Sequence, residues 1–328
     1  MAEYINIKGQ NIEVVASDPA NPTLGQIWYN STSNTLKGEA LGVASWATGG
    51  SLGTANQEFV SLGTQTAALQ AGGEIVPGGN NPPYTSATEE YNGTSWTGGG
   101  SIPTPTGGIG GCGIQTAALA GGGETPGGIS ATSFEYDGST WSPTNNLNTG
   151  RFKFATAGTQ TAGLFFGGNT TVVTGVTEEY NGTSWTNSNN LILGRVFLAG
   201  AGIQTAALGF GGSSPAVPGN TGATEGYDGT SWTTLAGSLN TARAALAGGG
   251  TQTAAVVFGG SGPTGATELY DGISWTSSPV SMNTARSGLG GAGTQTAAVA
   301  FGGNTGTRST ATEEWTGPAP VTKTITAS

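Results

Sequence analysis

The chain has 328 residues, of which 61 are glycine and only 9% are charged, and its formal net charge at pH 7 is -10. This acidic balance, without any run of basic residues, argues against binding to nucleic acid or to an anionic membrane surface. Histidine is absent and Cys112 is the single cysteine. These two facts exclude a Ser-His-Asp triad, a copper site with histidine ligands, an intrachain disulfide and a thiolate metal site.

The N-terminal residues predict neither a signal peptide nor membrane insertion. The stretch MAEYINIKGQ has no apolar core, and no segment reaches the roughly 18 consecutive apolar residues that a membrane helix needs. We therefore expect a protein that is made in a cytosol.

Residues 1–42 lie outside the repeat that fills most of the chain. After the turn-rich sequence DPANP, the stretch GQIWYNSTSNTLKG predicts a β-hairpin with strands at residues 27–29 and 35–37. A module this small buries little surface alone. We expect it to pack on something else and interpret it as an attachment segment.

From residue 43 onward the chain repeats a unit with fixed anchors. A glutamine recurs 43 to 50 residues apart, a Gly-Gly pair follows it seven and eight residues later, and an aromatic residue comes next. The glutamines are Gln65, Gln115, Gln160, Gln204, Gln252 and Gln295, and the aromatic residues are Tyr91, Tyr136, Tyr180, Tyr227, Tyr270 and Trp315. Such a period indicates a repeat architecture in which each unit buries its apolar face against its neighbours.

Each unit predicts four short strands. The first precedes the glutamine, the second ends at Gly-Gly, the third contains the aromatic residue, and the fourth begins at a tryptophan five residues later. Asn-Gly or Asp-Gly pairs such as Asn92-Gly93 follow the tyrosines and predict two-residue hairpin loops with positive φ at both positions.

The sixth unit lacks its fourth strand. The segment ASWATGGSLGTA around Trp46 aligns with the fourth strand of the other units. We therefore predict that Trp46 pairs with the strand of Trp315 and closes a ring of six units, which removes exposed sheet edges.

The pattern of Gly-Gly, T-E-x-Y, a tight turn and Trp, with LNTAR before the next strand, resembles the kelch repeat of β-propellers. The resemblance covers residues 43–316 in six in-phase copies. It implies an all-β protein, a six-bladed kelch-type β-propeller closed by an N-terminal strand. Residues 1–42 are then the attachment segment, and residues 317–328 a C-terminal tail.

A second resemblance concerns the T-Q-T-A and Y-N-G-T-S-W motifs and the segment DPANPTLGQIWYNSTSNTLKG. They are similar to virion appendage proteins, of tail-fibre or decoration type, of marine bacteriophages. The resemblance implies localisation to a virion, oligomerisation on the particle and docking onto other virion proteins through residues 1–42. Two hypotheses stay open: a propeller that presents a face to a host receptor or glycan, and a structural decoration of capsid or tail without a receptor.

A glutamate precedes the aromatic residue by two positions in five units, at Glu89, Glu178, Glu225, Glu268 and Glu313, and Phe134 replaces it in the second unit. A ring of carboxylates binding a cation is one interpretation. We favour structural pairing with the arginines at the kelch arginine position, Arg151, Arg195, Arg243 and Arg286. The first unit has Asn56 at that position and the second a glycine-rich stretch, so the pairing is left open there.

No enzyme is predicted. The sequence DGSTW at residues 137–141 lacks one residue of the sialidase Asp-box spacing. Adjacent glutamates such as Glu89 and Glu90 point to opposite faces of a strand and cannot form the facing pair of a glycosidase. We therefore assign no catalytic, cofactor-binding or metal-binding residue, and we expect no cofactor.

The loops between the second and third strands differ among the units, and variable loops on a rigid scaffold commonly carry binding. Tolerated insertion is an equal alternative. Our candidate contact residues are Asn80, Asn81, Tyr84, Thr171, Asn220 and Arg308. Loops rich in hydroxyl groups and poor in charge suit hydrogen bonding to neutral glycan. The six repeat glutamines either line a central channel or cap the turn between the first two strands.

Overall fold

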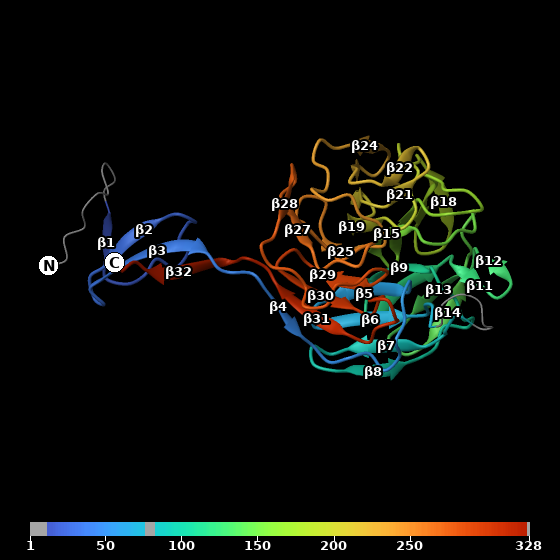
Figure 1. The fold of residues 1–328 in the computed structure, drawn as a ribbon, viewed down its shortest axis with the longest axis horizontal. Helices are drawn as coiled ribbons and strands as arrows, with labels where there is room; N and C mark the ends of the chain where they lie inside the picture. Colours follow the sequence, from blue (N-terminus) through green and yellow to red (C-terminus); the bar gives the residue numbers. More distant parts are fainter. Residues whose placement is uncertain (1–11, 76–82, 327–328) are drawn as a thin grey trace. The chain divides into compact units, whose positions relative to one another are not determined.

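The structure is a computed structural model that describes residues 12–75 and 83–326. Every regular element in these residues is a β-strand (Figure 1). The described residues form no helix that is long and apolar enough to cross a membrane. The chain divides into two compact units. The larger is Ser45–Thr316, and the smaller combines the N-terminal residues up to Ala44 with the residues from Gly317 onward.

The described part of the larger unit contains four-stranded antiparallel sheets that follow the predicted repeat. The first sheet comprises β5 (Val60–Thr64), β6 (Ala67–Ala71), β7 (Thr88–Tyr91) and β8 (Trp96–Gly99). The second comprises β9 (Gly110–Ile114), β10 (Ala117–Gly121), β13 (Ser133–Tyr136) and β14 (Trp141–Thr144). The third comprises β15 (Ala155–Thr159), β16 (Ala162–Phe166), β17 (Thr177–Tyr180) and β18 (Trp185–Ser188).

Three further sheets continue the series. The fourth comprises β19 (Ala199–Ile203), β20 (Ala206–Phe210), β23 (Thr224–Tyr227) and β24 (Trp232–Thr234). The fifth comprises β25 (Ala247–Gly250), β26 (Ala255–Phe258), β27 (Thr267–Tyr270) and β28 (Trp275–Ser277). The sixth comprises β29 (Gly290–Gly293), β30 (Ala297–Phe301), β31 (Thr312–Thr316) and β4 (Ser45–Thr48). Short two-stranded ribbons, β11 (Glu124–Thr125) with β12 (Gly128–Ile129) and β21 (Ser213–Ser214) with β22 (Val217–Asn220), lie in the loops of the second and fourth sheets.

The core lies between neighbouring sheets. In β16, Leu164, Phe165 and Phe166 are all fully buried, because both faces of each sheet are covered and the second strand therefore reads as a continuous apolar run. One apolar cluster joins Ala68 and Tyr91 of the first sheet to Val299 and Phe301 of the sixth. The first and last sheets of the series thus share a core.

The sixth sheet is completed from the other end of the chain. Strand β4 pairs antiparallel with β31, and Trp46 lies opposite Trp315, which is the pairing that the sequence predicts. The two rings lie 5.3 Å apart, and Trp46 Nε1 donates to Thr267 Oγ1 of the fifth sheet over 3.1 Å.

The first strands of consecutive sheets contact one another in the middle of the unit (Figure 1). Strand β29 of the sixth sheet contacts β5 of the first in the same way. Each first strand has a glycine with positive φ as its last or second-last residue, such as Gly63 at 103° in β5. A Cβ atom there would approach Ala67 O to 2.2 Å, so this tight turn requires glycine.

The predicted two-residue loop between the third and fourth strands is wrong. In the first sheet Tyr91 pairs with Trp96, which leaves four residues in the loop. Asn92 Oδ1 accepts the N–H groups of Thr94 and Ser95, each over 2.9 Å. Positive φ occurs at Gly93 and not at Asn92. The asparagine is therefore present because its side chain caps the turn, not because it tolerates a left-handed backbone.

The smaller unit has one sheet in the order β1, β2, β3, β32. Strands β2 (Ile27–Asn30) and β3 (Thr35–Leu41) form the predicted hairpin, and β1 (Glu13–Val15) runs parallel to β2. We expected residues 317–328 to form a tail, but β32 (Pro320–Thr324) pairs with β3 along its free edge. The edge of a hairpin offers unpaired backbone groups that an extended segment satisfies.

A polar cluster ties the smaller unit together. Asp18 accepts hydrogen bonds from Lys37 Nζ, Asn30 Nδ2 and the buried Trp28 Nε1 at 2.5, 2.7 and 3.0 Å. These bonds, led by that from Lys37, lower the pKa of Asp18 to about 2. The turn DPANP that contains Asp18 is therefore held on the hairpin.

The pairing of β4 with β31 predicts that Trp46 contributes as much to the free energy of unfolding as the tryptophan of any other sheet. Trp46→Ala should lower the free energy of unfolding by about 3–5 kcal/mol, the usual cost of truncating a buried aromatic side chain. Trp275→Ala, at the equivalent place of the fifth sheet, is the matched control. Denaturant titrations of both variants test this. A loss for Trp275→Ala alone would mean that β4 contributes nothing to the sixth sheet.

Candidate functional site

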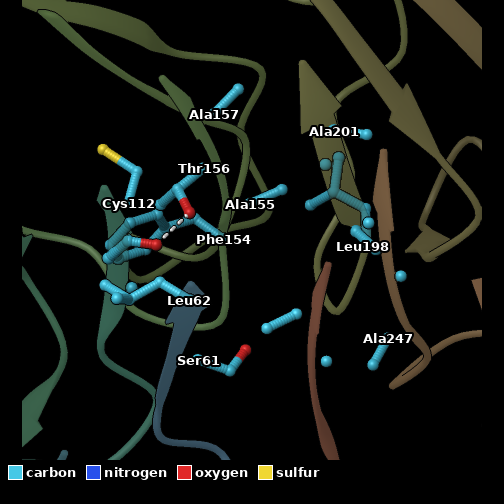
Figure 2. A pocket seen from close by; sticks show the side chains of 18 of the residues that line it. Ser61, Leu62, Cys112, Phe154, Ala155, Thr156, Ala157, Leu198, Ala201 and Ala247 are labelled. Atoms are coloured by element: carbon cyan, nitrogen blue, oxygen red, sulfur yellow. Dashed lines mark hydrogen bonds between the residues drawn. The ribbon is translucent and has the colours of Figure 1, made fainter. Parts of the chain in front are cut away.

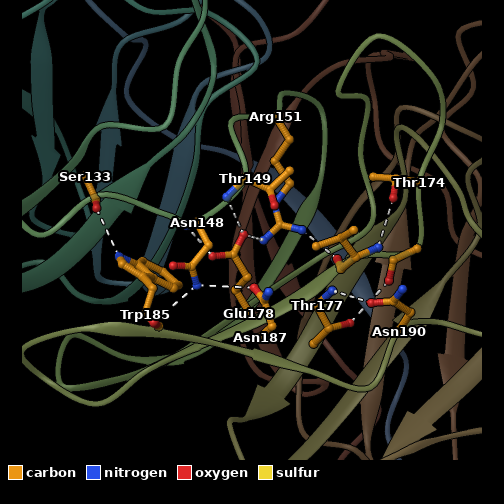
Figure 3. Close-up of polar contacts among 12 residues, drawn as sticks. Ser133, Asn148, Thr149, Arg151, Thr174, Thr177, Glu178, Trp185, Asn187 and Asn190 are labelled. Atoms are coloured by element: carbon orange, nitrogen blue, oxygen red, sulfur yellow. Dashed lines mark hydrogen bonds and ion pairs between the residues drawn. The ribbon is translucent and has the colours of Figure 1, made fainter.

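The repeat arginines and glutamates form buried ion pairs within their sheets, as predicted (Figure 3). Nη2 of each arginine lies 2.6–3.0 Å from a carboxylate oxygen, in the pairs Arg151–Glu178, Arg195–Glu225, Arg243–Glu268 and Arg286–Glu313. Glu178 also accepts the backbone N–H of Asn148 over 2.7 Å. Burial lowers the pKa of Arg151 to about 10, against the opposing effect of Glu178. These glutamates therefore hold the scaffold.

The six repeat glutamines have a role that the sequence did not predict. Gln115 Nε2 donates to Ala68 O over 2.9 Å and to Tyr91 O over 2.7 Å, both in the preceding sheet. The other five make the same two bonds to the sheet before them. The interpretations of a channel lining or a turn cap are therefore both wrong, because the amides fasten neighbouring sheets together.

Four tyrosines of the third strands, Tyr91, Tyr136, Tyr180 and Tyr227, make a similar contact. Tyr91 donates to Glu314 and Tyr136 to Glu90, each over 2.6 Å and each in the preceding sheet. Burial and the facing carboxylate raise the pKa of both phenols to about 12. In the adjacent glutamates Glu89-Glu90 and Glu313-Glu314, the second side chain is thus a structural hydrogen-bond acceptor.

Six residues at one position of the repeat form a ring, which we call the six-residue ring. Each lies two residues before the first strand of its sheet and has a left-handed backbone with φ between 51° and 60°. They are Glu58, Gly108, Lys153, Phe197, Ala245 and Gly288. Each N–H donates to the carbonyl of the ring residue in the preceding sheet, from Gly108 to Glu58 and onward to Gly288. Glu58 N then donates to Gly288 O, so these bonds of 2.8–3.0 Å form a closed ring.

The ring carries side chains where glycine would fit better. A left-handed backbone costs of order 1–3 kcal/mol for an ordinary residue, and two of the six positions are glycine. Glu58, Lys153, Phe197 and Ala245 are not. Lys153 Nζ lies 3.2 Å from a Glu58 carboxylate oxygen and 4.6 Å from the centre of the Phe197 ring. Strain of this kind clusters at functional sites.

A hollow of about 380 Å³ lies against one arc of the ring. Its size is within the range of about 300–1,000 Å³ that is typical of small-molecule sites. One carboxylate, one aromatic ring, three side-chain amides and three hydroxyl groups line it, from Glu58, Phe197, Gln57, Asn220, Asn304, Ser213, Ser261 and Ser287. Burial raises the pKa of Glu58, and Lys153 opposes this shift. The hollow is therefore a polar site with an apolar patch.

The channel between the first strands has a different character (Figure 2). It holds a cavity of about 240 Å³ lined largely by glycine backbone and small apolar side chains, among them Leu62, Ala157, Ala201 and Cys112. Thr156 Oγ1 donates to the carbonyl of Gly111 over 2.6 Å, and burial raises the pKa of the Cys112 thiol to about 12. Glu58, Lys153 and Phe197 of the six-residue ring also line this cavity, and Glu58 and Phe197 line the hollow as well.

The structure separates the candidate loop residues. Asn220 lines the hollow, and its Nδ2 donates to Ser261 Oγ over 2.8 Å. Tyr84 donates to Glu124 over 2.9 Å, and Arg308 pairs with Glu74 over 3.0 Å, so both fasten a loop to the loop of the next sheet. Thr171 is exposed in the loop of the third sheet and is not among the residues that line the hollow. Asn80 and Asn81 lie outside the described residues.

The sequence interpretation missed Gln57, Glu58, Lys153 and Phe197. The signal that could have found them is a variable position, two residues before each first strand, inside an otherwise constant repeat.

Searches with protein-family models and against curated proteins return no match for this chain.

The tyrosine contacts predict a loss of stability at high pH. The folded protein holds the phenol protons of Tyr91, Tyr136 and Tyr227 up to a pKa of about 12, whereas an unfolded tyrosine titrates near about 10. Their contribution to the free energy of unfolding is therefore complete below pH of about 10 and is lost between about 10 and 12. Phenolate absorbance and melting temperature, measured together across this window, test the prediction. Tyrosines that all titrate near 10 in the folded protein would contradict it.

Proposed function

We propose that the larger unit is a six-bladed, kelch-type β-propeller closed by its N-terminal strand, and that it is a non-enzymatic binding module. Its ligand is neutral carbohydrate, which it takes into the hollow beside the six-residue ring. The observation that carries this proposal is the ring itself. Four of its positions keep a side chain at a strained backbone conformation that glycine adopts freely, and three of these residues, Glu58, Phe197 and Ala245, line the hollow.

The lining chemistry supports a neutral, hydroxyl-rich ligand. Phe197 offers an apolar surface to the C–H face of a sugar ring. The amides of Gln57, Asn220 and Asn304 both donate and accept hydrogen bonds. Glu58 accepts from hydroxyl groups, and its charge is balanced by Lys153 at 3.2 Å, so the site favours neither a free anion nor a free cation.

The proposal places this module on a virus particle, where it attaches to host-surface glycan while the smaller unit docks onto other virion proteins. That part rests on the resemblance of residues 18–38 and of the repeat wording to phage appendage proteins. Repeated presentation on a particle would strengthen weak binding at each hollow by multivalency.

A second candidate function is structural decoration without a receptor. One observation favours it: Tyr84, Asn220 and Arg308 all bond to a neighbouring loop. Side chains used in this way stiffen the loop face and are less free to bind a ligand.

Phe197→Ala tests the binding proposal. Ala245 occupies the equivalent ring position with φ of 51°, so alanine is accepted there. We expect the purified wild-type protein to bind members of an immobilised panel of neutral oligosaccharides, and Phe197→Ala to bind them about tenfold or more weakly, as for a truncated aromatic anchor. Phe152→Ala is the matched control, since Phe152 also lies near Lys153 but does not line the hollow. Equal binding by Phe197→Ala would refute the site, and no binding to host-surface glycan, with assembly onto particles retained, would favour decoration.

A further inference from the structure

The first sheet lacks a positive charge that four other sheets contain. In the sixth sheet Arg286 Nη1 donates to Gly302 O over 2.9 Å and Nη2 to Glu313 over 3.0 Å. The fourth and fifth sheets repeat this arrangement around Arg195 and Arg243. The guanidinium thus bridges the first glycine of the Gly-Gly pair and the repeat glutamate.

Two amides stand in for the guanidinium in the first sheet. Asn56 lies 16 residues before Gly72, as Arg286 does before Gly302. Its Nδ2 donates to Gly72 O over 3.2 Å, and Gln70 Nε2 donates to the same oxygen over 2.6 Å. Only the bond to the glycine carbonyl is therefore replaced.

The amide oxygens of the same two side chains accept no hydrogen bond. Asn56 Oδ1 and Gln70 Oε1 have no hydrogen-bond partner, and both side chains are 0% exposed. Glu89 retains the backbone N–H groups of Gly53 and Thr54, over 2.6 and 3.0 Å. Among the residues that the structure describes, no cationic side chain pairs with it.

These three groups lie on one face of the sheet. Gln70 is directly opposite Glu89 in the β6–β7 pair, and opposite residues in antiparallel strands project to the same side. Asn56 occupies the position from which arginine reaches the equivalent glutamate in the other sheets. A carboxylate and two amide oxygens therefore face the volume that the guanidinium fills elsewhere.

The second sheet makes this imbalance informative. It has Thr106 at the arginine position and Phe134 at the glutamate position, both buried. Four sheets thus contain both charges and one contains neither, whereas the first sheet contains the negative charge alone. An unpaired buried carboxylate beside two unsatisfied acceptors is costly, and a small inorganic cation would satisfy all three.

We propose that the first sheet binds a hard, oxygen-seeking inorganic cation between Glu89, Asn56 and Gln70, in place of the guanidinium of its sister sheets. Carboxylate and amide oxygens are the ligands that such ions take. The site differs from a usual acidic metal cluster, since no group of three or more His, Cys, Asp or Glu side chains occurs among the described residues. One carboxylate implies weak binding of a divalent ion, with Kd on the order of 0.1–1 mM.

Thermal unfolding of the full-length protein tests the proposal. The protein is dialysed against a chelator into tetramethylammonium chloride, and sodium, potassium, calcium or magnesium chloride is then exchanged in at constant ionic strength. We expect at least one of the four ions to raise the midpoint by about 2 °C or more, with saturation. No response to any of them would overturn the proposal and leave water as the occupant.

Two variants locate the site. Asn56→Arg with Gln70→Ala recreates the sixth sheet, which has Arg286 and Ala300 at these positions, and it should melt higher than the wild type and lose the response to cation. Glu89→Gln removes the charge and keeps one of the two oxygens that accept the backbone N–H groups of Gly53 and Thr54, so it should also lose the response. If the double variant fails to fold, Glu89→Gln decides. A full response in Glu89→Gln, or in the folded double variant, would place the ion elsewhere and refute the site.

Discussion

Each sheet of the larger unit is fastened to the sheet that precedes it in the series. In every sheet the repeat glutamine bonds two carbonyls of the preceding sheet, and the tryptophan bonds a threonine or serine hydroxyl there. In the first four sheets the tyrosine also bonds a glutamate of the preceding sheet. Because the first sheet bonds the sixth through Gln65, Tyr91 and Trp96, the series has no free end. The six-residue ring of backbone hydrogen bonds depends on this continuity. So does the hollow, whose lining comes from several sheets.

Features that are set within one repeat, such as strand order, could be predicted from the sequence. Side-chain contacts between two sheets could not. Strand order follows from local anchors, and the pairing of Trp46 with Trp315 follows from a unit that lacks its last strand. The loop at Asn92 was mispredicted because its length is set by the register of the strands around it. The partner of Gln65 could not be predicted, since it lies 250 residues away in another sheet. The role of Glu58 could not be predicted, since it depends on backbone hydrogen bonds that join six residues from six sheets.

Departures from the repeat carry most of the information about function. A residue that recurs in every copy does the same packing in every copy. Phe197 stands at a left-handed ring position where two other sheets have glycine, which adopts this backbone with less strain. Asn56 stands where four other sheets have an arginine that pairs with the repeat glutamate. The first departure supports carbohydrate binding at the hollow, and the second supports a cation inside the first sheet. The two proposals depend on different residues and stand or fall separately.

Native-state hydrogen exchange at the six ring amides tests the central claim that the series is closed. Closure predicts strong and similar protection for all six, including the amide of Glu58, whose bond to Gly288 O joins the first sheet to the sixth, because each bond lies in one cooperative unit. Protection at the other five ring amides with fast exchange at Glu58 would contradict it. That outcome would mean that the sheets form an open array.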